Sequence, residues 1–112
     1  MEINGITLNF KLTNAKVAER YESALKELQK EADQLEKKPL PGLAENIYAQ
    51  IDLVHRFVDS IFGAGTYDSL GVDPDDLDEN LDIATQITED AKNQSKAIQR
   101  RNARYAPERS KR

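Results

Sequence analysis

Apolar side chains recur at two different spacings along this chain, and each spacing predicts a different kind of element. Near the N-terminus they alternate with polar residues after Asn4-Gly5, a dipeptide typical of tight hairpin turns because both residues tolerate positive φ. A period of two places such side chains on one face of a strand. We therefore expect a short β-hairpin within residues 1–12, packed on the helices that follow through Ile6, Leu8, Phe10 and Leu12.

Two amphipathic helices are predicted next, because apolar residues then recur at steps of three and four. The first begins at Thr13 or Asn14, either of which can cap a helix, and ends at Lys37-Lys38. The second runs from about Leu43 to Phe62 and is the most apolar segment, with Gly63 as the left-handed residue that ends it. The predicted core of this second helix is Ile51, Val54, Phe57, Val58 and Ile61.

A third helix is predicted to follow a loop that contains one helical turn near Tyr67–Leu70. Asp73 would cap it and Pro74 would be its first residue, since acids and Pro suit a helix start. Its apolar stripe is Leu77, Leu81, Ala84, Ile87 and Ala91. Beyond Ala91 the only apolar residues before Tyr105 are Ala97, Ile98 and Ala103, so the second half should project from the body or meet another chain. We expect Ala106-Pro107 to end it.

These elements predict a mainly α fold: one three-helix domain over residues 1–105, with an N-terminal hairpin and a long, partly projecting C-terminal helix. A chain of 112 residues suits a single domain. Residues 106–112 would form a basic, mobile tail. The chain has no Cys, no run of about 20 apolar residues and no signal-peptide pattern, so we expect a cytoplasmic protein without disulfides or a membrane span.

Charge divides the chain into an acidic body and a basic end. Residues 1–99 carry 10 Lys and Arg against 19 Asp and Glu, whereas residues 100–112 carry six Lys and Arg against Glu108 alone. The basic end can be a solvated helix terminus, since cations suit the negative end of the helix dipole, or it can attract an acidic partner, another copy or nucleic acid. Only Tyr105 is available there for base stacking, and the acidic body opposes DNA, so nucleic acid is the least favoured of these partners.

His55 is the only histidine, with Asp52 and Asp59 within one turn of it. These three residues make a weak metal-ligand set, and a polar helix face explains them better. The loop Gly63-Ala64-Gly65-Thr66 has the glycines and hydroxyl of a phosphate-binding loop. It lacks the GK[ST] ending and follows a helix, so we interpret it as a helix end and tight turn.

The acidic run before the third helix invites comparison with a calcium loop, which needs acids at alternating positions around a central Gly. Pro74 interrupts that pattern, and helix capping explains the same acids, with recognition of a partner by an acidic surface as the alternative. The run comprises Asp73, Asp75, Asp76, Asp78 and Glu79. We find no spacing typical of a catalytic site, and we expect neither an enzyme nor a cofactor.

Three stretches together resemble a known family: MEINGITLNF leading into ERYESALKELQKEA, then FVDSIFGAGTYDSLGV, and RYAPERSKR at the end. The family comprises small tail-morphogenesis proteins of tailed bacteriophages and prophages of Gram-positive bacteria. The resemblance spans nearly the whole chain and is most specific at Phe62–Thr66 and at Tyr105, Pro107 and Arg109. It carries no catalytic residues.

The resemblance implies a chaperone that binds the tape-measure protein in the host cytoplasm. The alternatives are a self-associating structural subunit of the virion and, less favoured, a nucleic-acid adaptor using the basic tail. In either protein-binding case we expect the contact face on the distal third helix. The candidate residues are Ala91, Ala97, Ile98, Arg101, Arg104, Tyr105 and Arg109.

Overall fold

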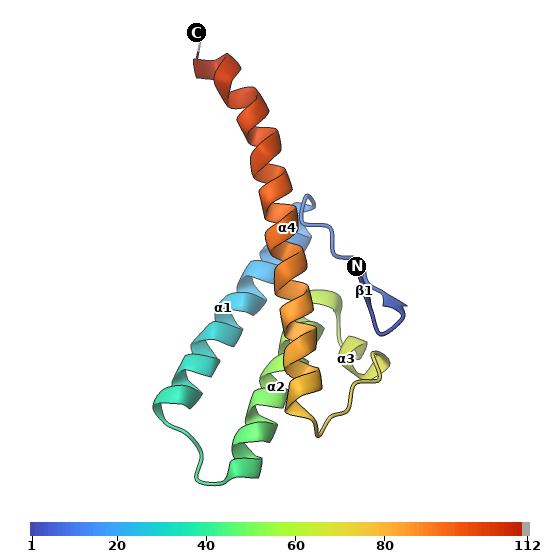
Figure 1. The fold of residues 1–112 in the computed structure, drawn as a ribbon, viewed down its shortest axis with the longest axis vertical. Helices are drawn as coiled ribbons and strands as arrows, with labels where there is room; N and C mark the ends of the chain where they lie inside the picture. The colour runs from blue at the N-terminus through green and yellow to red at the C-terminus, as the bar shows by residue number, and fades with distance from the viewer. Residues whose placement is uncertain (111–112) are drawn as a thin grey trace.

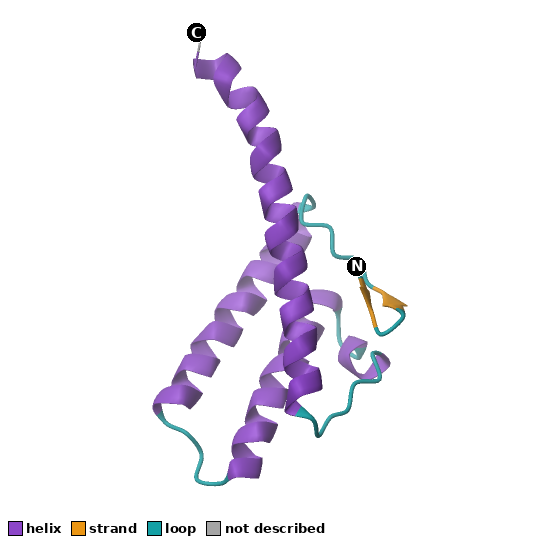
Figure 2. Cartoon of the chain, viewed as in Figure 1, coloured by secondary structure: helices purple, strands orange, loops and turns teal. Residues whose placement is uncertain are grey.

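The computed structural model describes residues 1–110, with side chains as far as Ala103, and shows an elongated, mainly α-helical protein of 62 × 34 × 20 Å (Figure 1). Three long helices and one short helix follow a two-stranded antiparallel sheet, as predicted (Figure 2). The elements are β1 (Glu2–Ile3), β2 (Ile6–Thr7), α1 (Ala15–Lys37), α2 (Leu43–Phe62), α3 (Thr66–Ser69) and α4 (Leu77–Ser110). No helix among residues 1–110 is long and apolar enough to cross a membrane.

The hairpin turns at Asn4 and Gly5, both at positive φ (50° and 78°), as the dipeptide predicts. Its strands are shorter than expected, because only Glu2 and Ile3 pair with the chain after the turn. Ile6 is therefore exposed, and the predicted four-residue apolar face is wrong at that position. Residues Leu8 and Phe10 are buried beyond the strand, and the Phe10 ring meets Tyr21 of α1 and Phe62 of α2 at centroid distances of 5.4 and 5.5 Å.

Helix α1 is capped as predicted, and a glycine occupies the capping position at each end of α2. Asn14 accepts hydrogen bonds from the backbone N–H groups of Lys16 and Val17, at 3.0 and 3.3 Å. Gly63 ends α2, but its φ of 113° and ψ of 154° place it in an extended region that only glycine adopts readily, not in the predicted left-handed region. The chain leaves α2 extended here because α3 begins only three residues later.

Helix α4 begins and ends later than predicted. Asp73 accepts a hydrogen bond from the N–H of Asp75 in a separate turn, and Asp76 is the residue whose carboxylate caps the helix, at the N–H of Glu79. The helix also continues past Pro107 to Ser110. Proline has a helical φ, and so near a helix end it removes only one backbone hydrogen bond. The mobility predicted for residues 106–112 stays a prediction, because residues 111–112 and the side chains after Ala103 lie outside the described part of the chain.

The core lies where α1 and α4 pack against α2. All five residues predicted for the core of α2 are buried, together with Leu53. The predicted stripe of α4 is confirmed at Ile87 and Ala91, which are buried, and is wrong near the helix start, where Asn80 and Ile83 are buried and Leu81 is 43% exposed. The buried face of α4 runs through positions 80, 83, 87 and 91, and a polar Asn at its start hides that spacing in the sequence.

Candidate partner-binding surface

The predicted partner-binding residues on α4 divide into three groups. Ala91 is buried in the protein's own core, so the expectation that a partner orders it is wrong. Ile98 is half-buried, whereas Ala97 and Arg101 are exposed. Arg104, Tyr105 and Arg109 lie on α4, and their side chains fall outside the described residues. Among the predicted residues with described side chains, Ala97 and Arg101 are therefore open to a partner, and Ile98 is partly so.

Helix α4 leaves the body where its side chains meet the segment before α1. The Gln94 side chain donates to the Phe10 carbonyl at 2.6 Å and accepts from the Leu12 N–H at 2.9 Å, which joins this segment to α4. Beside it lies a recess of about 360 Å³ that brings Ala91 and Ile98 together with Leu12 and Tyr21. After Ile98, α4 continues for 12 residues to Ser110, which is about 18 Å at 1.5 Å per residue.

A second and larger opening, which we call the apolar groove, lies over α2 between the last turns of α1 and the start of α4. It has a volume of about 670 Å³. Leu53 and Val54 of α2 form its floor, and most of its walls are apolar. The apolar wall residues are Leu28, Ala32, Leu35 and Pro39 on the side of α1 and Leu81 and Ala84 on α4.

The apolar groove was not predicted from the sequence, although Leu28, Ala32 and Leu35 follow the apolar spacing of the first helix. Leu28 and Leu35 are only half-buried, and Ala32 is exposed, because no described element covers them. Two further apolar residues are exposed outside the groove: Leu40 in the loop between α1 and α2, and Leu43 at the start of α2, which is 80% exposed. No local signal marks the groove, because the apolar stripe of a helix looks the same in sequence whether or not another element covers it.

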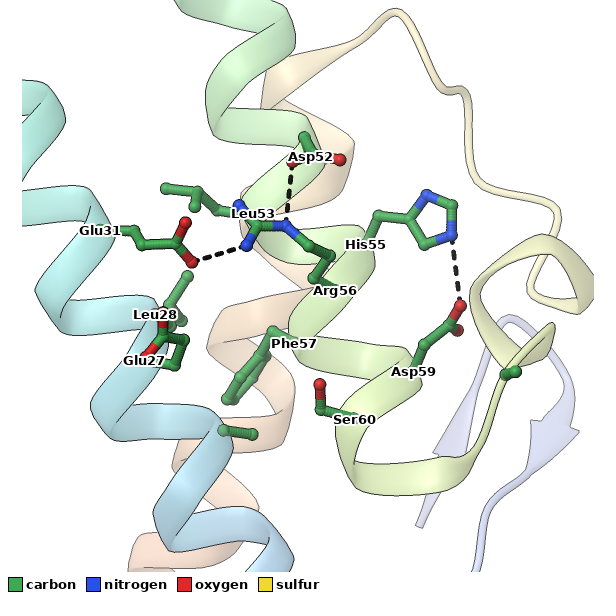
Figure 3. A pocket seen from close by; sticks show the side chains of 12 residues that line it. Glu27, Leu28, Glu31, Asp52, Leu53, His55, Arg56, Phe57, Asp59 and Ser60 are labelled. Atoms are coloured by element: carbon green, nitrogen blue, oxygen red, sulfur yellow. Dashed lines mark hydrogen bonds and ion pairs between the residues drawn. The ribbon is translucent and has the colours of Figure 1, made fainter.

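A polar pocket of about 360 Å³ lies between α1 and α2 (Figure 3). Arg56 of α2 reaches across it to Glu31 of α1 at 2.7 Å and also contacts Asp52 at 2.9 Å. The hydrogen bond to Glu31 raises the pKa of the Arg56 guanidinium above its ordinary value. The pair with Glu31 joins α1 to α2, whereas the pair with Asp52 lies within α2. Because both pairs are partly exposed to water, we assign them a modest structural role.

His55 and Asp52 line the same pocket, but the Asp52 carboxylate contacts Arg56 rather than the imidazole. The imidazole Nε2 lies 3.2 Å from Asp59, and the ring stacks on Tyr67 with a centroid distance of 4.3 Å. Within residues 1–110, no cluster of three or more His, Asp or Glu side chains is arranged to hold a metal ion. The arrangement of His55 is that of a half-exposed packing residue.

The glycine loop after α2 binds a carboxylate of the protein itself. Asp59 accepts hydrogen bonds from the N–H groups of Gly65 and Tyr67, at 3.4 and 2.8 Å, and thereby holds the start of α3. The predicted helix end and tight turn are confirmed by Gly63, which ends α2, and by Gly65, which precedes α3 in the left-handed conformation. The N–H groups that resemble a phosphate cradle thus already have an anionic partner.

The acidic run before α4 is used for capping, as predicted, although the cap is Asp76 and not Asp73. Glu79 accepts from the N–H of Asp73 at 3.0 Å, and Asp75 accepts from the Tyr48 hydroxyl at 2.8 Å. These acids therefore hold the loop against the first turn of α4 and against α2. Asp78 and Asp82 remain exposed on the first turns of α4.

The fold and these surfaces define a small helical protein, built as an open three-helix layer with an uncovered apolar groove and one projecting helix. Residues 4–112 match the model of a family of unknown function, DUF6673, and the chain belongs to that family. No curated protein and no solved structure matches it.

Proposed function

We propose that this protein is a non-enzymatic protein-binding module that holds a helix of a partner protein in its apolar groove. The observation that carries this proposal is the groove itself, which leaves side chains such as Leu35 and Leu81 partly in contact with water. Exposed apolar surface costs about 25 cal/mol per Å², so covering it favours association. A groove between helices is a common receptor for an amphipathic helix.

The partner we propose is the tape-measure protein of a tailed phage, and the role is that of an assembly chaperone. The support is the resemblance of the whole chain to small tail-morphogenesis proteins. A long helical tape measure exposes apolar stripes that aggregate unless another chain covers them. The acidic body, with 19 Asp and Glu in residues 1–99, would keep such a complex in solution.

Co-expression tests this proposal. The tape-measure protein should be soluble with the full-length chain and insoluble without it. Leu81→Lys places a charge in the groove at a half-exposed position and should reduce the soluble fraction. Leu43→Lys, at an exposed position that does not line the groove, is the matched control and should leave it unchanged.

Two results would contradict the chaperone role. The first is a tape-measure protein that is equally soluble alone. The second is this chain present in mature particles in fixed proportion to the tail proteins, since a chaperone should leave before the tail is complete. That second result would favour a self-associating structural subunit, an alternative supported by the opposite charges of the two halves of α4.

A further inference from the structure

Helix α1 carries an apolar stripe that its contact with α2 does not cover. The residues that α1 buries are Val17 and Ala24, which lie seven positions apart and therefore on one face. Beside this face runs a stripe in which apolar residues recur at alternating steps of three and four, and none of them is buried. Such a spacing is typical of the seam of a coiled coil. The α1 stripe comprises Ala18, Tyr21, Leu25, Leu28, Ala32 and Leu35.

Helix α4 carries a stripe with the same spacing. Its core face begins with Asn80 and Ile83, and the stripe runs beside that face. The steps are again three, four, three, four and three. Ala91 is buried in the core, whereas the other members are half-buried or exposed. The α4 stripe comprises Leu81, Ala84, Thr88, Ala91, Ser95 and Ile98.

The two stripes face each other in an antiparallel register. Leu35 and Leu81 both line the apolar groove, and Ala18 and Ile98 both line the recess at the other end. These two pairs of residue numbers have the same sum, so every member of one stripe has a counterpart in the other. Helices α1 and α4 pack on α2 and not on each other, and they diverge toward the loop that joins α1 to α2 (Figure 1). The groove and the recess are therefore the wide and narrow ends of one opening, which we call the notch, between the α1 stripe and the α4 stripe.

The outer edges of the notch differ in charge. Along α1 the edge consists of three exposed residues at intervals of seven, two of which are acids. Along α4 it consists of three exposed residues at the same interval, with one cation and no acid. A helix lying in the notch would thus meet negative charge on one side and positive charge on the other. The edge residues are Glu22, Gln29 and Glu36 on α1 and Thr85, Lys92 and Gln99 on α4.

The walls of the notch leave room for large side chains. Ala32 and Ala84 are counterparts in the antiparallel register, and both line the wide end. Small residues on facing walls leave holes, and in helical bundles such holes accept the large apolar side chains of a neighbouring helix. The notch therefore favours a helix with large apolar residues at steps of three and four.

We propose that one helix of the partner protein lies along the whole notch and completes a four-helix bundle with α1, α2 and α4. This site rests on the proposed function, because it extends the apolar groove into the recess. The α4 stripe from Leu81 to Ile98 is about 26 Å long at 1.5 Å per residue, so the bound segment has about 18 residues, or five turns. That segment carries Lys or Arg on its edge toward α1 and Asp or Glu on its edge toward α4.

Variants at the two ends of the notch separate this site from the proposed function. In co-expression, Ser95→Glu at the narrow end should lower the soluble fraction of the tape measure as Leu81→Lys does at the wide end. Asn93→Glu is the matched control, since Asn93 is exposed on α4 and lines neither end, and it should have no effect. An effect of Leu81→Lys without one of Ser95→Glu would refute the extended site and leave the proposed function standing. No soluble complex with any chain would refute the proposed function, and the site with it.

Limited proteolysis of the purified complex, followed by mass spectrometry, identifies the tape-measure segment that the chain protects. We expect one helical segment with apolar residues at steps of three and four. A protected segment without this spacing would count against the notch.

The protected segment, made as a peptide, tests the charge of the notch edge. Glu22→Lys with Glu36→Lys should weaken its binding at least about fivefold, because two attractions become repulsions. Glu19→Lys with Glu27→Lys changes the net charge equally at exposed positions that line neither end of the notch, and it should have little effect. Equal effects of the two double variants would show that the edge charges do not select the partner.

The chain has no Cys, so engineered cysteines report what covers the notch. Ala32→Cys should react with a maleimide in the free chain and be protected in the complex, whereas Asp33→Cys, the exposed neighbour outside the stripe, should react in both. Ala32→Cys with Ala84→Cys should form no disulfide, and a disulfide within one chain would mean that α1 and α4 cover each other and leave no site. Sedimentation velocity gives the remaining check: a dimer of the parent chain that Ser95→Glu dissociates would make a second copy the occupant, contrary to the proposal.

Discussion

The hydroxyl of Tyr67 donates a hydrogen bond to the side-chain oxygen of Asn80 at 2.5 Å, and this contact joins α3 to the first turns of α4. Asn80 is fully buried. Its amide donates to the carbonyls of Asp73 and Asp76, at 3.0 and 2.8 Å. The Asn80 side chain thus forms hydrogen bonds with the loop before α4, with the start of α4 and with α3, all within an apolar core.

Replacing Asn80 should therefore be costly. Asn80→Ala removes the acceptor of the buried Tyr67 hydroxyl and one of two donors to the carbonyls of Asp73 and Asp76, which keep their backbone hydrogen bonds. We expect a loss of about 2–3 kcal/mol in the free energy of unfolding, measured in urea. Tyr67→Phe should cost about 1–2 kcal/mol. Tyr48→Phe removes a hydroxyl that is bonded to Asp75 at the surface, and as a control it should change stability by less than about 0.5 kcal/mol. Equal effects of the two tyrosine variants would contradict a special role for the Asn80 contact.

Stability should decrease at alkaline pH. Burial raises the pKa of the Tyr67 hydroxyl above its ordinary value of 10.0, so the unfolded chain loses this proton at a lower pH than the folded chain. The contribution is fully present below about pH 10 and is lost as the pH rises through the folded-state pKa. Urea unfolding at several pH values above 9 should show a smaller decline for Tyr67→Phe than for the parent chain. An identical decline would mean that Tyr67 titrates normally.

Phe57 tests the register of α2. It is buried among residues of α1 and α2, and its ring lies 6.3 Å from that of Tyr21. Phe57→Ala should lower the free energy of unfolding by about 3–5 kcal/mol, a large part of the stability of a small domain. Leu43→Ala, on the same helix but exposed, should have little effect. A thermal midpoint unchanged by Phe57→Ala would place this ring on the surface.

The basic end of the chain should not bind DNA appreciably at physiological salt. Phosphate contacts release counterions, so true binding weakens steeply as salt rises. The acidic residues of the body oppose the few cations at the end of α4. A mobility-shift titration with the full chain should show no complex. Tight, salt-sensitive binding that disappears on deletion of residues 100–112 would reverse this ranking of partners.

Regular apolar spacing and turn chemistry account for the parts of the fold that the sequence predicted. Asn4-Gly5 placed the hairpin turn, Asn14 capped α1, and the core positions of α2 were identified individually. Each of these signals is local, because the physical cause lies within a few residues of the feature. The bounds of α2 followed for the same reason.

The errors arise where distant contacts decide the outcome. The register of α4 depends on Asn80, a polar residue whose burial is explained only by Tyr67 and by two carbonyls of the preceding loop. The apolar groove depends on how α1 and α4 lie on α2, and a helical stripe looks the same in sequence whether or not another element covers it. Ala91 was assigned to a partner for the same reason, although its own chain buries it.

Helix α4 contains neither Gly nor Pro from Leu77 to Ala106, and nothing in that stretch interrupts its backbone. The projecting part of the helix is therefore stiff along its length. A load applied near Ser110 is transmitted along about 45 Å of helix to the hydrogen bonds of Asn80, with those of Gln94 as an intermediate support. A partner at the outer end is consequently held at a defined angle to the body. Two glycines introduced after Ile98 would let the helix bend there, and that angle would no longer be fixed.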